Sequence, residues 1–118
     1  MKAMFLFPMI VALSLPLMAK KLESEYRDTF CDRMGGVREY RLQDRARIDC
    51  LSSTYAIEIE FARKWAEGIG QSLYYAHMSG KKPAIALIMA PGKEETYLNR
   101  LSTVALHHGI KVFIIDKE

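Results

Sequence analysis

The stretch that decides the expected fold is residues 47–76, RIDCLSSTYAIEIEFARKWAEGIGQSLYYA. Residues 47–51 and 55–61 read as two strands, and the polar Ser-Ser-Thr segment between them is typical of a turn. Residues 62–79 then follow a helical pattern that ends at Gly80. We therefore expect a strand, a turn, a strand and a long helix in this order.

Three acidic residues lie inside these two strands, where a buried core would not favour them. Asp49 interrupts an apolar strand pattern, and Glu58 and Glu60 alternate with isoleucine and phenylalanine. Because side chains two residues apart share one face of a strand, Glu58 and Glu60 point the same way.

The helix that follows carries Lys64, Gln71 and Tyr75 at positions i, i+7 and i+11. At about 100° per residue, these three side chains lie within about 40° of one another around the helix. Carboxylates on two neighbouring strands, facing a stripe of Lys, Gln and Tyr, predict a site for a cation and a phosphate.

The rest of the chain adds two helices and three strands to this unit. We predict helices at residues 20–34 and 94–108, and strands at residues 37–42, 83–89 and 111–115. The element order is therefore αβββαβαβ. Strands that alternate with helices form parallel pairs, whereas the first two strands form an antiparallel hairpin. The expected fold class is α/β, with a mixed five-stranded sheet flanked by helices.

The length and composition fit one ordinary domain. The chain has 118 residues, of which 50% are hydrophobic, so a core can form. The formal net charge of +3 is too small to indicate nucleic-acid binding by itself.

Residues 1–19, MKAMFLFPMIVALSLPLMA, have the layout of a secretory signal peptide: a lysine near the start, an apolar run and a final alanine. Pro8 and Pro16 disfavour a membrane-spanning helix. Leu17 stands where a small residue is preferred before cleavage, so an uncleaved anchor stays open as the alternative. We expect cleavage to leave residues 20–118 as a single periplasmic or secreted domain without stable membrane insertion.

The chain contains two cysteines, Cys31 and Cys50. An exported chain meets oxidising conditions, which favours a disulfide between them, and two free buried thiols are the alternative. Neither cysteine has a Cys or His at the spacing of a metal site.

The element order, with an Asp on the second strand and acids on the third, resembles the PD-(D/E)xK nuclease superfamily, whose fold is restriction-endonuclease-like. Asp49 matches the family Asp and Glu58 matches the family Glu. The segment from Gln71 to Tyr75, QSLYY, is similar to the Q-x-x-x-Y helix motif of the RecB-type branch. The resemblance covers most of the element order but few residues. Glu60 departs from it, because the family has a lysine there.

The resemblance implies hydrolysis of phosphodiester bonds with Mg²⁺ or Mn²⁺ as the cofactor. Asp49 and Glu58 would then bind the ion, and Glu60 would hold a second ion or a metal-bound water. Some family members supply the lysine from the following helix, and Lys64 would take that role here, orienting water or stabilising negative charge. Without it, the fold would be inactive or purely a binding module.

The other two residues of the stripe, Gln71 and Tyr75, would hydrogen-bond the substrate or the groups around the metal. The same two side chains could instead simply pack against the sheet. Lys64 could equally be a solvated helix lysine.

The acidic residues also have structural explanations that the sequence leaves open. Asp49 could form an ion pair with Arg45 or Arg47, and Glu58 and Glu60 could lie on the solvent face of an edge strand.

We therefore predict an exported, metal-dependent, nuclease-like protein that acts on nucleic acid, with a homodimer as an open assembly state. The alternative is a catalytically inactive nuclease-fold module that binds nucleic acid or protein in the periplasm. A third reading is a structural domain whose carboxylates make ion pairs alone. Whether the chain is an enzyme at all, a Mg-dependent deoxyribonuclease for example, is left open.

Overall fold

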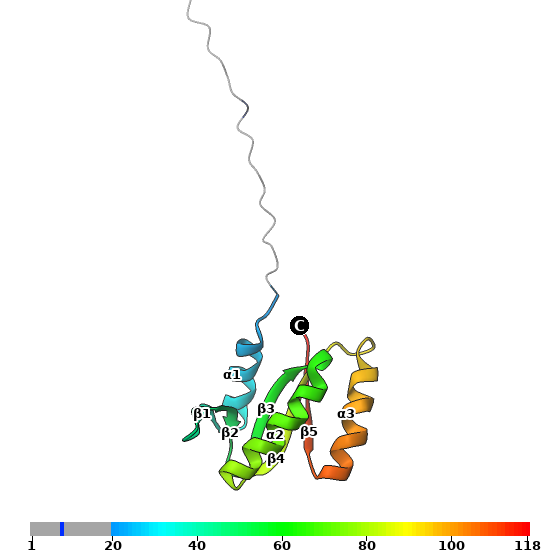
Figure 1. The fold of residues 1–118 in the computed structure, drawn as a ribbon. Helices are drawn as coiled ribbons and strands as arrows, with labels where there is room; N and C mark the ends of the chain where they lie inside the picture. The colour runs from blue at the N-terminus through cyan, green and yellow to red at the C-terminus, as the bar shows by residue number, and fades with distance from the viewer. Residues whose placement is uncertain (1–7, 9–19) are drawn as a thin grey trace, which may run out of the picture.

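The structure is a computed structural model that describes Pro8 and residues 20–118 (Figure 1). The predicted signal peptide at residues 1–19 lies, apart from Pro8, outside the described residues. The described elements follow the predicted order: α1 (Glu23–Arg33), β1 (Val37–Arg41), β2 (Arg47–Leu51), β3 (Tyr55–Phe61), the 3₁₀ turn η1 (Ala62–Lys64), α2 (Trp65–Ser79), β4 (Lys82–Met89), α3 (Glu95–His108) and β5 (Lys111–Asp116).

The five strands form one mixed sheet in the order β1-β2-β3-β4-β5. The pairs β1–β2 and β2–β3 are antiparallel, whereas β3–β4 and β4–β5 are parallel. Each parallel pair is connected through a helix, as a parallel connection requires. The predicted α/β class with a mixed five-stranded sheet flanked by helices is confirmed.

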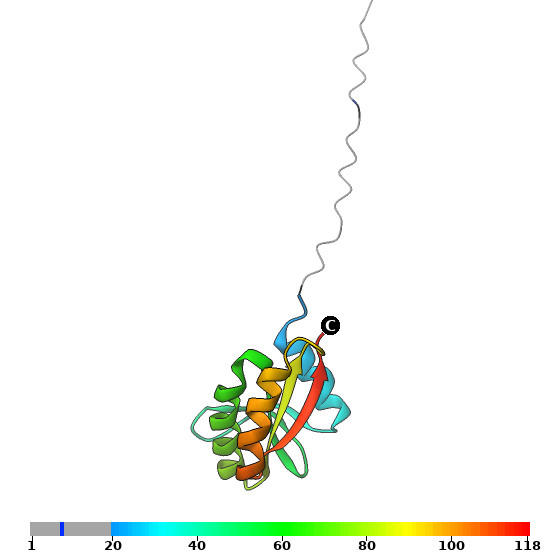
Figure 2. The ribbon, with the colours of Figure 1, turned by 90° about the vertical axis from the view of Figure 1, so that its right-hand side faces the viewer.

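The helices cover the sheet from both sides, with α1 on one face and α2 and α3 on the other (Figure 2). One core cluster joins α1 to the sheet through Phe30, Ile57 and Ile59. A second cluster joins α2 and α3 to the opposite face, where Leu87 packs near Leu101. Because β4 is covered on both faces, its residues from 84 to 89 are all buried. Among the described residues, no helix is long and apolar enough to cross a membrane.

Strand β3 is internal to the sheet, which places its two glutamates in the interior. Glu58 and Glu60 are each 5% exposed. The alternative that they lie on the solvent face of an edge strand is therefore wrong, because β2 and β4 flank β3 and α2 covers it.

The sheet opens where β2 separates from β3. Their ladder comprises the pairs Cys50–Ile57 and Leu51–Ala56, and it ends before Asp49. A buried backbone N–H that loses its strand partner needs another acceptor. The opening therefore brings a polar side chain into the sheet at this point, and the candidate site lies there.

A disulfide joins α1 to β2 next to this opening. Cys31 and Cys50 are bonded, with their Cα atoms 5.5 Å apart. Gly36 fits closely against the disulfide, because a Cβ atom at this residue would lie 2.5 Å from the sulfur of Cys50. No side chain larger than hydrogen can occupy that space without a shift of the disulfide.

The helix predicted for residues 62–79 is divided in the structure. Residues 62–64 form η1, and α2 begins at Trp65, so Lys64 caps the helix instead of lying on it. The even 100° spacing assumed between Lys64 and Gln71 therefore does not apply, because Lys64 has non-helical backbone angles.

Candidate functional site

Asp49 fills the gap between the two separating strands. Its Oδ2 atom accepts a hydrogen bond from the backbone N–H of Ile59 at 2.9 Å. The carboxylate thus takes the place that a carbonyl of β2 would occupy in a continuous ladder. Among the described residues, the alternative ion pair of Asp49 with Arg45 or Arg47 does not form, and Arg47 approaches Glu39 at 3.7 Å instead.

Glu58 and Glu60 extend from β3 toward α2, on the face opposite Ile57 and Ile59. The Oε2 atom of Glu58 is buried, and no donor in the described part of the chain reaches it. Besides burial, the charge of Asp49 contributes to the raised pKa of Glu58, so the two carboxyl groups lie near each other, and a direct bond between them requires a proton on one of them. The pair is therefore short of positive charge when both groups are ionised.

Gln71 connects the two glutamates from α2. With its amide nitrogen turned toward the sheet, it donates to Oε1 of Glu58 at 3.1 Å and to Oε1 of Glu60 at 3.0 Å. The structure therefore brings Gln71 to the carboxylates, as the sequence predicted, although the rest of this side chain is exposed.

The acidic groups have strongly raised pKa values. Burial, followed by the charge of Asp49, raises the pKa of Glu58 to about 10. Burial, followed by the charges of Glu23 and Asp49, raises the pKa of Glu60 to about 7. Burial likewise raises the pKa of Asp49, against the opposing effect of the Ile59 hydrogen bond. Raised acid pKa values in one cluster are a feature of functional sites.

Close packing by Gly68 holds Glu60 in place. A Cβ atom at residue 68 would lie 3.2 Å from Cγ of Glu60 and 3.8 Å from its Cβ. A glycine in a helix interior costs about 1 kcal/mol relative to alanine, so a specific reason for it is expected. The approach of α2 to Glu60 supplies that reason.

Tyr75 lies at the inner end of the site and serves the core as well. It is 8% exposed and packs with Leu42, Ile48 and Ala56. Burial raises its pKa, and the charges of Glu58 and Asp49 add to the effect, which places it near both carboxylates. Tyr75 therefore packs in the core, as one alternative predicted, and also lies near the carboxylates, as the other predicted.

Lys64 lies at the outer end of the site. In the part of the chain that the structure describes, it makes no ion pair within 4.0 Å. Burial raises the pKa values of Glu60 and Glu23, and the charge of Lys64 opposes that rise, so the ammonium group lies within electrostatic reach of both. Lys64 is thus close to the carboxylates without being bound to one.

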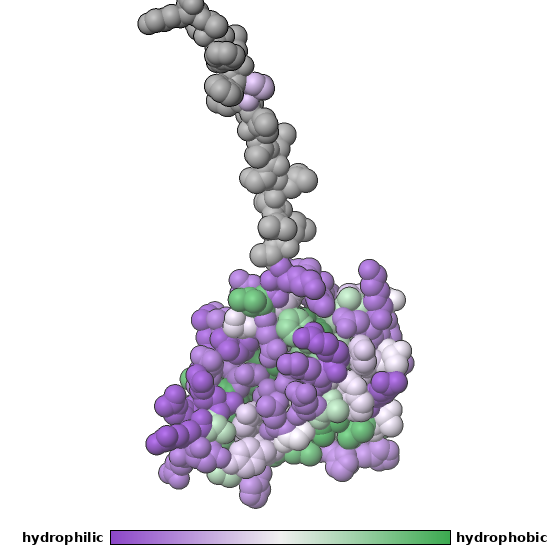
Figure 3. Space-filling view, turned by 45° about the horizontal axis from the view of Figure 1, so that its top comes forward, coloured by the Kyte–Doolittle hydropathy of each residue, from purple (hydrophilic) through white to green (hydrophobic). Residues whose placement is uncertain are grey.

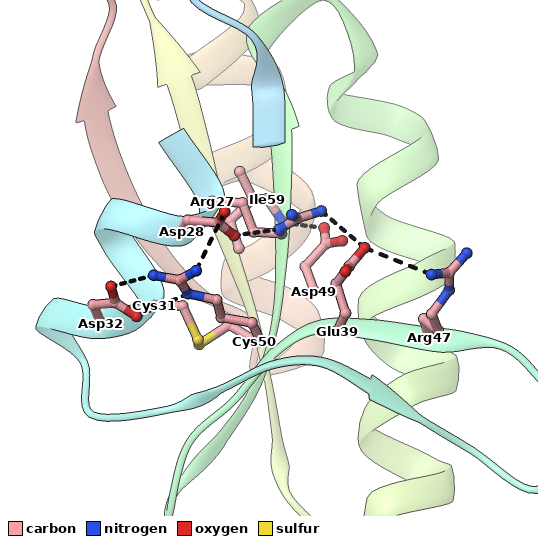
Figure 4. Close-up of polar contacts among 10 residues, drawn as sticks. Arg27, Asp28, Cys31, Asp32, Glu39, Arg47, Asp49, Cys50 and Ile59 are labelled. Carbon is pink, nitrogen blue, oxygen red and sulfur yellow. Dashed lines mark hydrogen bonds and ion pairs between the residues drawn. A yellow bond between two sulfur atoms is a disulfide. The ribbon is translucent and has the colours of Figure 1, made fainter. Parts of the chain in front are cut away.

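Two further charged residues at the site were not predicted. Glu23, the first residue of α1, has a pKa raised by burial and by Asp49. Arg27, one turn later, binds Glu39 of β1 at 3.1 Å and lowers the pKa of Asp49 (Figure 4). No sequence pattern indicates these contacts, because α1 and β1 meet β2 through tertiary packing.

Glu39 has an unusual backbone conformation. Its φ of +47° is rare for a residue other than glycine. The β1–β2 register skips the Glu39–Asp49 pair, and Figure 4 shows the two side chains side by side, next to Arg27. Strain of this kind, costing about 1–3 kcal/mol, often occurs at functional sites.

The donor set fits a hard cation with few protein ligands. Among the residues that the structure describes, no three His, Cys, Asp or Glu side chains converge as a complete metal cage. Mg²⁺, however, is usually held by one or two carboxylates and keeps several waters. Asp49 and Glu58, together with the orphaned Oε2 atom, provide such a pair.

Comparison with known proteins adds no relative: no family model, no curated protein and no solved structure matches this chain.

Proposed function

We propose that this protein is a metal-dependent nuclease that hydrolyses phosphodiester bonds of nucleic acid on a restriction-endonuclease-like fold. One observation carries the proposal: Asp49 and Glu58 meet at the opening of the sheet, and a buried oxygen of Glu58 has no donor. Burying such a pair is costly unless a cation neutralises it.

The topology supports the same proposal. A helix precedes three antiparallel strands, followed by a helix and a parallel strand. This is the element order that the resemblance implies, with an acid on β2 and acids on β3. The Q-x-x-x-Y segment also lies against those acids, through Gln71 and Tyr75.

In this proposal Asp49 and Glu58 hold Mg²⁺ or Mn²⁺. The bound ion would supply Lewis-acid stabilisation of the phosphate and a more acidic water. Gln71 keeps Glu58 and Glu60 at a fixed separation by donating to both. Tyr75 would supply a hydroxyl group near Glu58 and Asp49 from a ring that is packed in the core.

Glu60 takes the part that the family assigns to lysine. A carboxylate with a pKa of about 7 is suited to accept a proton from water near neutral pH. Lys64, which is near Glu60 and free of ion pairs within the described residues, would stabilise the negative charge that develops on the phosphate.

A catalytically inactive binding module is the second candidate. It is favoured by the hydrogen bonds that already hold the carboxyl groups. Gln71 donates to both Glu58 and Glu60, and Asp49 accepts from the backbone N–H of Ile59. A site satisfied in this way could persist without chemistry and bind nucleic acid or protein. We propose the same periplasmic or secreted location for either version, with a homodimer for a version that cuts both strands.

The test is a cleavage assay. The purified protein would be incubated with end-labelled single- and double-stranded DNA and RNA in Mg²⁺ or Mn²⁺. Matched variants are Asp49→Asn and Glu58→Gln, which keep shape and remove charge. Asp116→Asn, an exposed carboxylate on β5, is the control for purification.

We expect the parent and the Asp116→Asn variant to cut equally. Each site variant should lose at least about 100-fold in rate, because an interaction with the metal is removed. Cutting that all four proteins share would reveal a contaminant. No cutting by any of them, with tight binding retained, would favour the inactive module.

A further inference from the structure

A basic cavity lies beside the carboxylate site. It has a volume of about 330 Å³, and the residues around it are Lys20, Lys21, Leu22, Glu23, Phe61, Arg63 and Lys117. Four of these seven side chains carry a positive charge and one carries a negative charge. Such an excess of cations around one cavity favours an anionic ligand.

The cations are held on a shared framework. Two cations approach the ring of Phe61: the Cζ atom of Arg63 is 5.1 Å from the ring centre, and the Nζ atom of Lys117 is 5.5 Å from it. The two cations are therefore kept near each other by the same ring. Lys21 is partly neutralised, since it pairs with Glu118 at 3.2 Å. Figure 3 shows that hydrophilic residues cover most of the face from which the described chain begins.

The cavity and the carboxylate site are neighbours. Glu23 lines the cavity and also interacts electrostatically with Asp49 and Glu60. The short turn η1 supplies one cation to each side, with Arg63 at the cavity and Lys64 near the carboxylates. With the metal ion of the proposed function at the carboxylates, a ligand that spans both places would present an anion at each of them.

We propose that this cavity binds a phosphodiester group of a nucleic-acid strand, next to the phosphate held at the carboxylate site. The choice of nucleic acid as the ligand rests on the proposed function. A strand with successive phosphates fits two adjacent anion sites, whereas a single small anion fits one. Arg63 and Lys117 are the principal contacts.

Binding is measured separately from cleavage. A fluorescent single-stranded oligonucleotide would be titrated with protein in EDTA at several salt concentrations. The test variant is Arg63→Glu/Lys117→Glu. The matched control is Arg100→Glu/Lys111→Glu, which changes the net charge equally; Lys111 likewise lies 5.6 Å from an aromatic ring centre, that of Phe113.

We expect the cavity variant to weaken binding at least tenfold more than the control variant. The slope of log affinity against log salt should also fall by about 1.4, because each lost phosphate contact removes about 0.7 for a single strand. Equal weakening by the two variants would overturn the proposal, since only net charge would then matter. Unfolding is checked by the melting temperature of each variant.

Two further arms separate the outcomes. Vesicles that contain phosphatidylserine would be tested with the same variants, and loss of vesicle binding without loss of oligonucleotide binding would assign the cavity to a membrane surface and overturn the proposal. Asp49→Asn should keep metal-free oligonucleotide binding. If the parent does not cut nucleic acid but the cavity variant loses oligonucleotide binding, the nuclease proposal fails and the phosphate site stands. If the parent cuts and the cavity variant binds as the parent does, the phosphate site fails and the nuclease proposal stands.

Discussion

Glu58 combines burial with an incomplete set of hydrogen bonds. It accepts from Gln71 through one oxygen and lies near the carboxyl group of Asp49, while no donor among the described residues serves its Oε2 atom. At the scale of single residues, the site therefore lacks a positive charge when Glu58 is ionised. Both a proton and a divalent cation can supply the missing positive charge.

The first prediction concerns Glu58→Gln. Because the folded pKa of about 10 lies above the ordinary value of 4.5, the folded state holds a proton that the unfolded state releases. Stability contributed by this group is therefore full below about pH 4.5 and falls as the pH rises toward 10. Without metal, the variant should match the parent near pH 4 and be more stable by a few kcal/mol at pH 8.

Urea unfolding of both proteins between pH 4 and pH 9 measures this difference. Asp116→Asn, an exposed position on β5, is the control and should follow the parent at every pH. A constant offset between Glu58→Gln and the parent across the range would show that Glu58 is already ionised in the folded protein.

The second prediction compares two glycines of α2. Gly70 faces open space, so Gly70→Ala should stabilise the helix by up to about 1 kcal/mol. Gly68→Ala should gain less or lose stability, because its methyl group would lie 3.2 Å from Cγ of Glu60. It should also lower the cleavage rate, whereas Gly70→Ala should leave the rate unchanged.

Thermal melting and the cleavage assay test both variants side by side. Equal stabilisation by the two alanines would mean that α2 can shift away from Glu60 without cost, and Gly68 would then have no role in positioning it.

At the scale of elements, the site depends on how α1 is attached to the sheet. Glu23 and Arg27 reach the site from α1, whereas Asp49 belongs to β2. The disulfide between Cys31 and Cys50 fixes these two elements to each other. The tertiary link therefore serves stability and the geometry of the charged groups together.

The third prediction is that Cys31→Ala/Cys50→Ala loses about 3 kcal/mol of stability, the value expected for a loop closed over a separation of 19 residues. The melting temperature should fall by more than about 10 °C in a domain of this size. A reducing agent should lower the melting temperature of the parent and leave that of the variant unchanged. Insensitivity of the parent to reduction would contradict the prediction.

At the scale of the whole molecule, two helical layers and the sheet confine acidic and basic groups to neighbouring places. The acids lie in the opening between β2 and β3, and the cations surround the cavity next to the start of α1. The formal net charge of +3 gives no indication that acidic and basic groups are separated in space. We therefore expect metal ions and protons to act at the carboxylates and salt to act at the basic cavity.

The fourth prediction is a pH-dependent stabilisation by Mn²⁺ or Mg²⁺. A cation that binds only the folded state raises the free energy of unfolding by about 2.7 kcal/mol when its concentration is 100 times its dissociation constant. The melting temperature rises accordingly. Protons compete for the same carboxylates, whose pKa values are raised, so the shift should be larger at pH 8 than at pH 5.5.

Differential scanning calorimetry with and without Mn²⁺ measures the shift at both pH values. Asp49→Asn/Glu58→Gln should abolish it, and Asp116→Asn should retain it. A shift of equal size in all three proteins would place the ion elsewhere on the surface.

The sequence by itself determined the elements and their order. Strand alternation, helical periodicity and glycine stops are local properties, so the bounds of β2 and β3 were predicted to the residue. Pattern also indicated that Asp49, Glu58 and Gln71 share a site, because strand faces and the helix repeat depend on short-range geometry.

Only the tertiary structure decided the rest. The division of the long helix at Lys64, the separation of β2 from β3, and the arrival of Glu23, Arg27 and Glu39 all arise from contacts between distant segments. Burial and electrostatics depend on that packing, and therefore a sequence pattern could identify the carboxylates but could not determine how strongly each holds its proton.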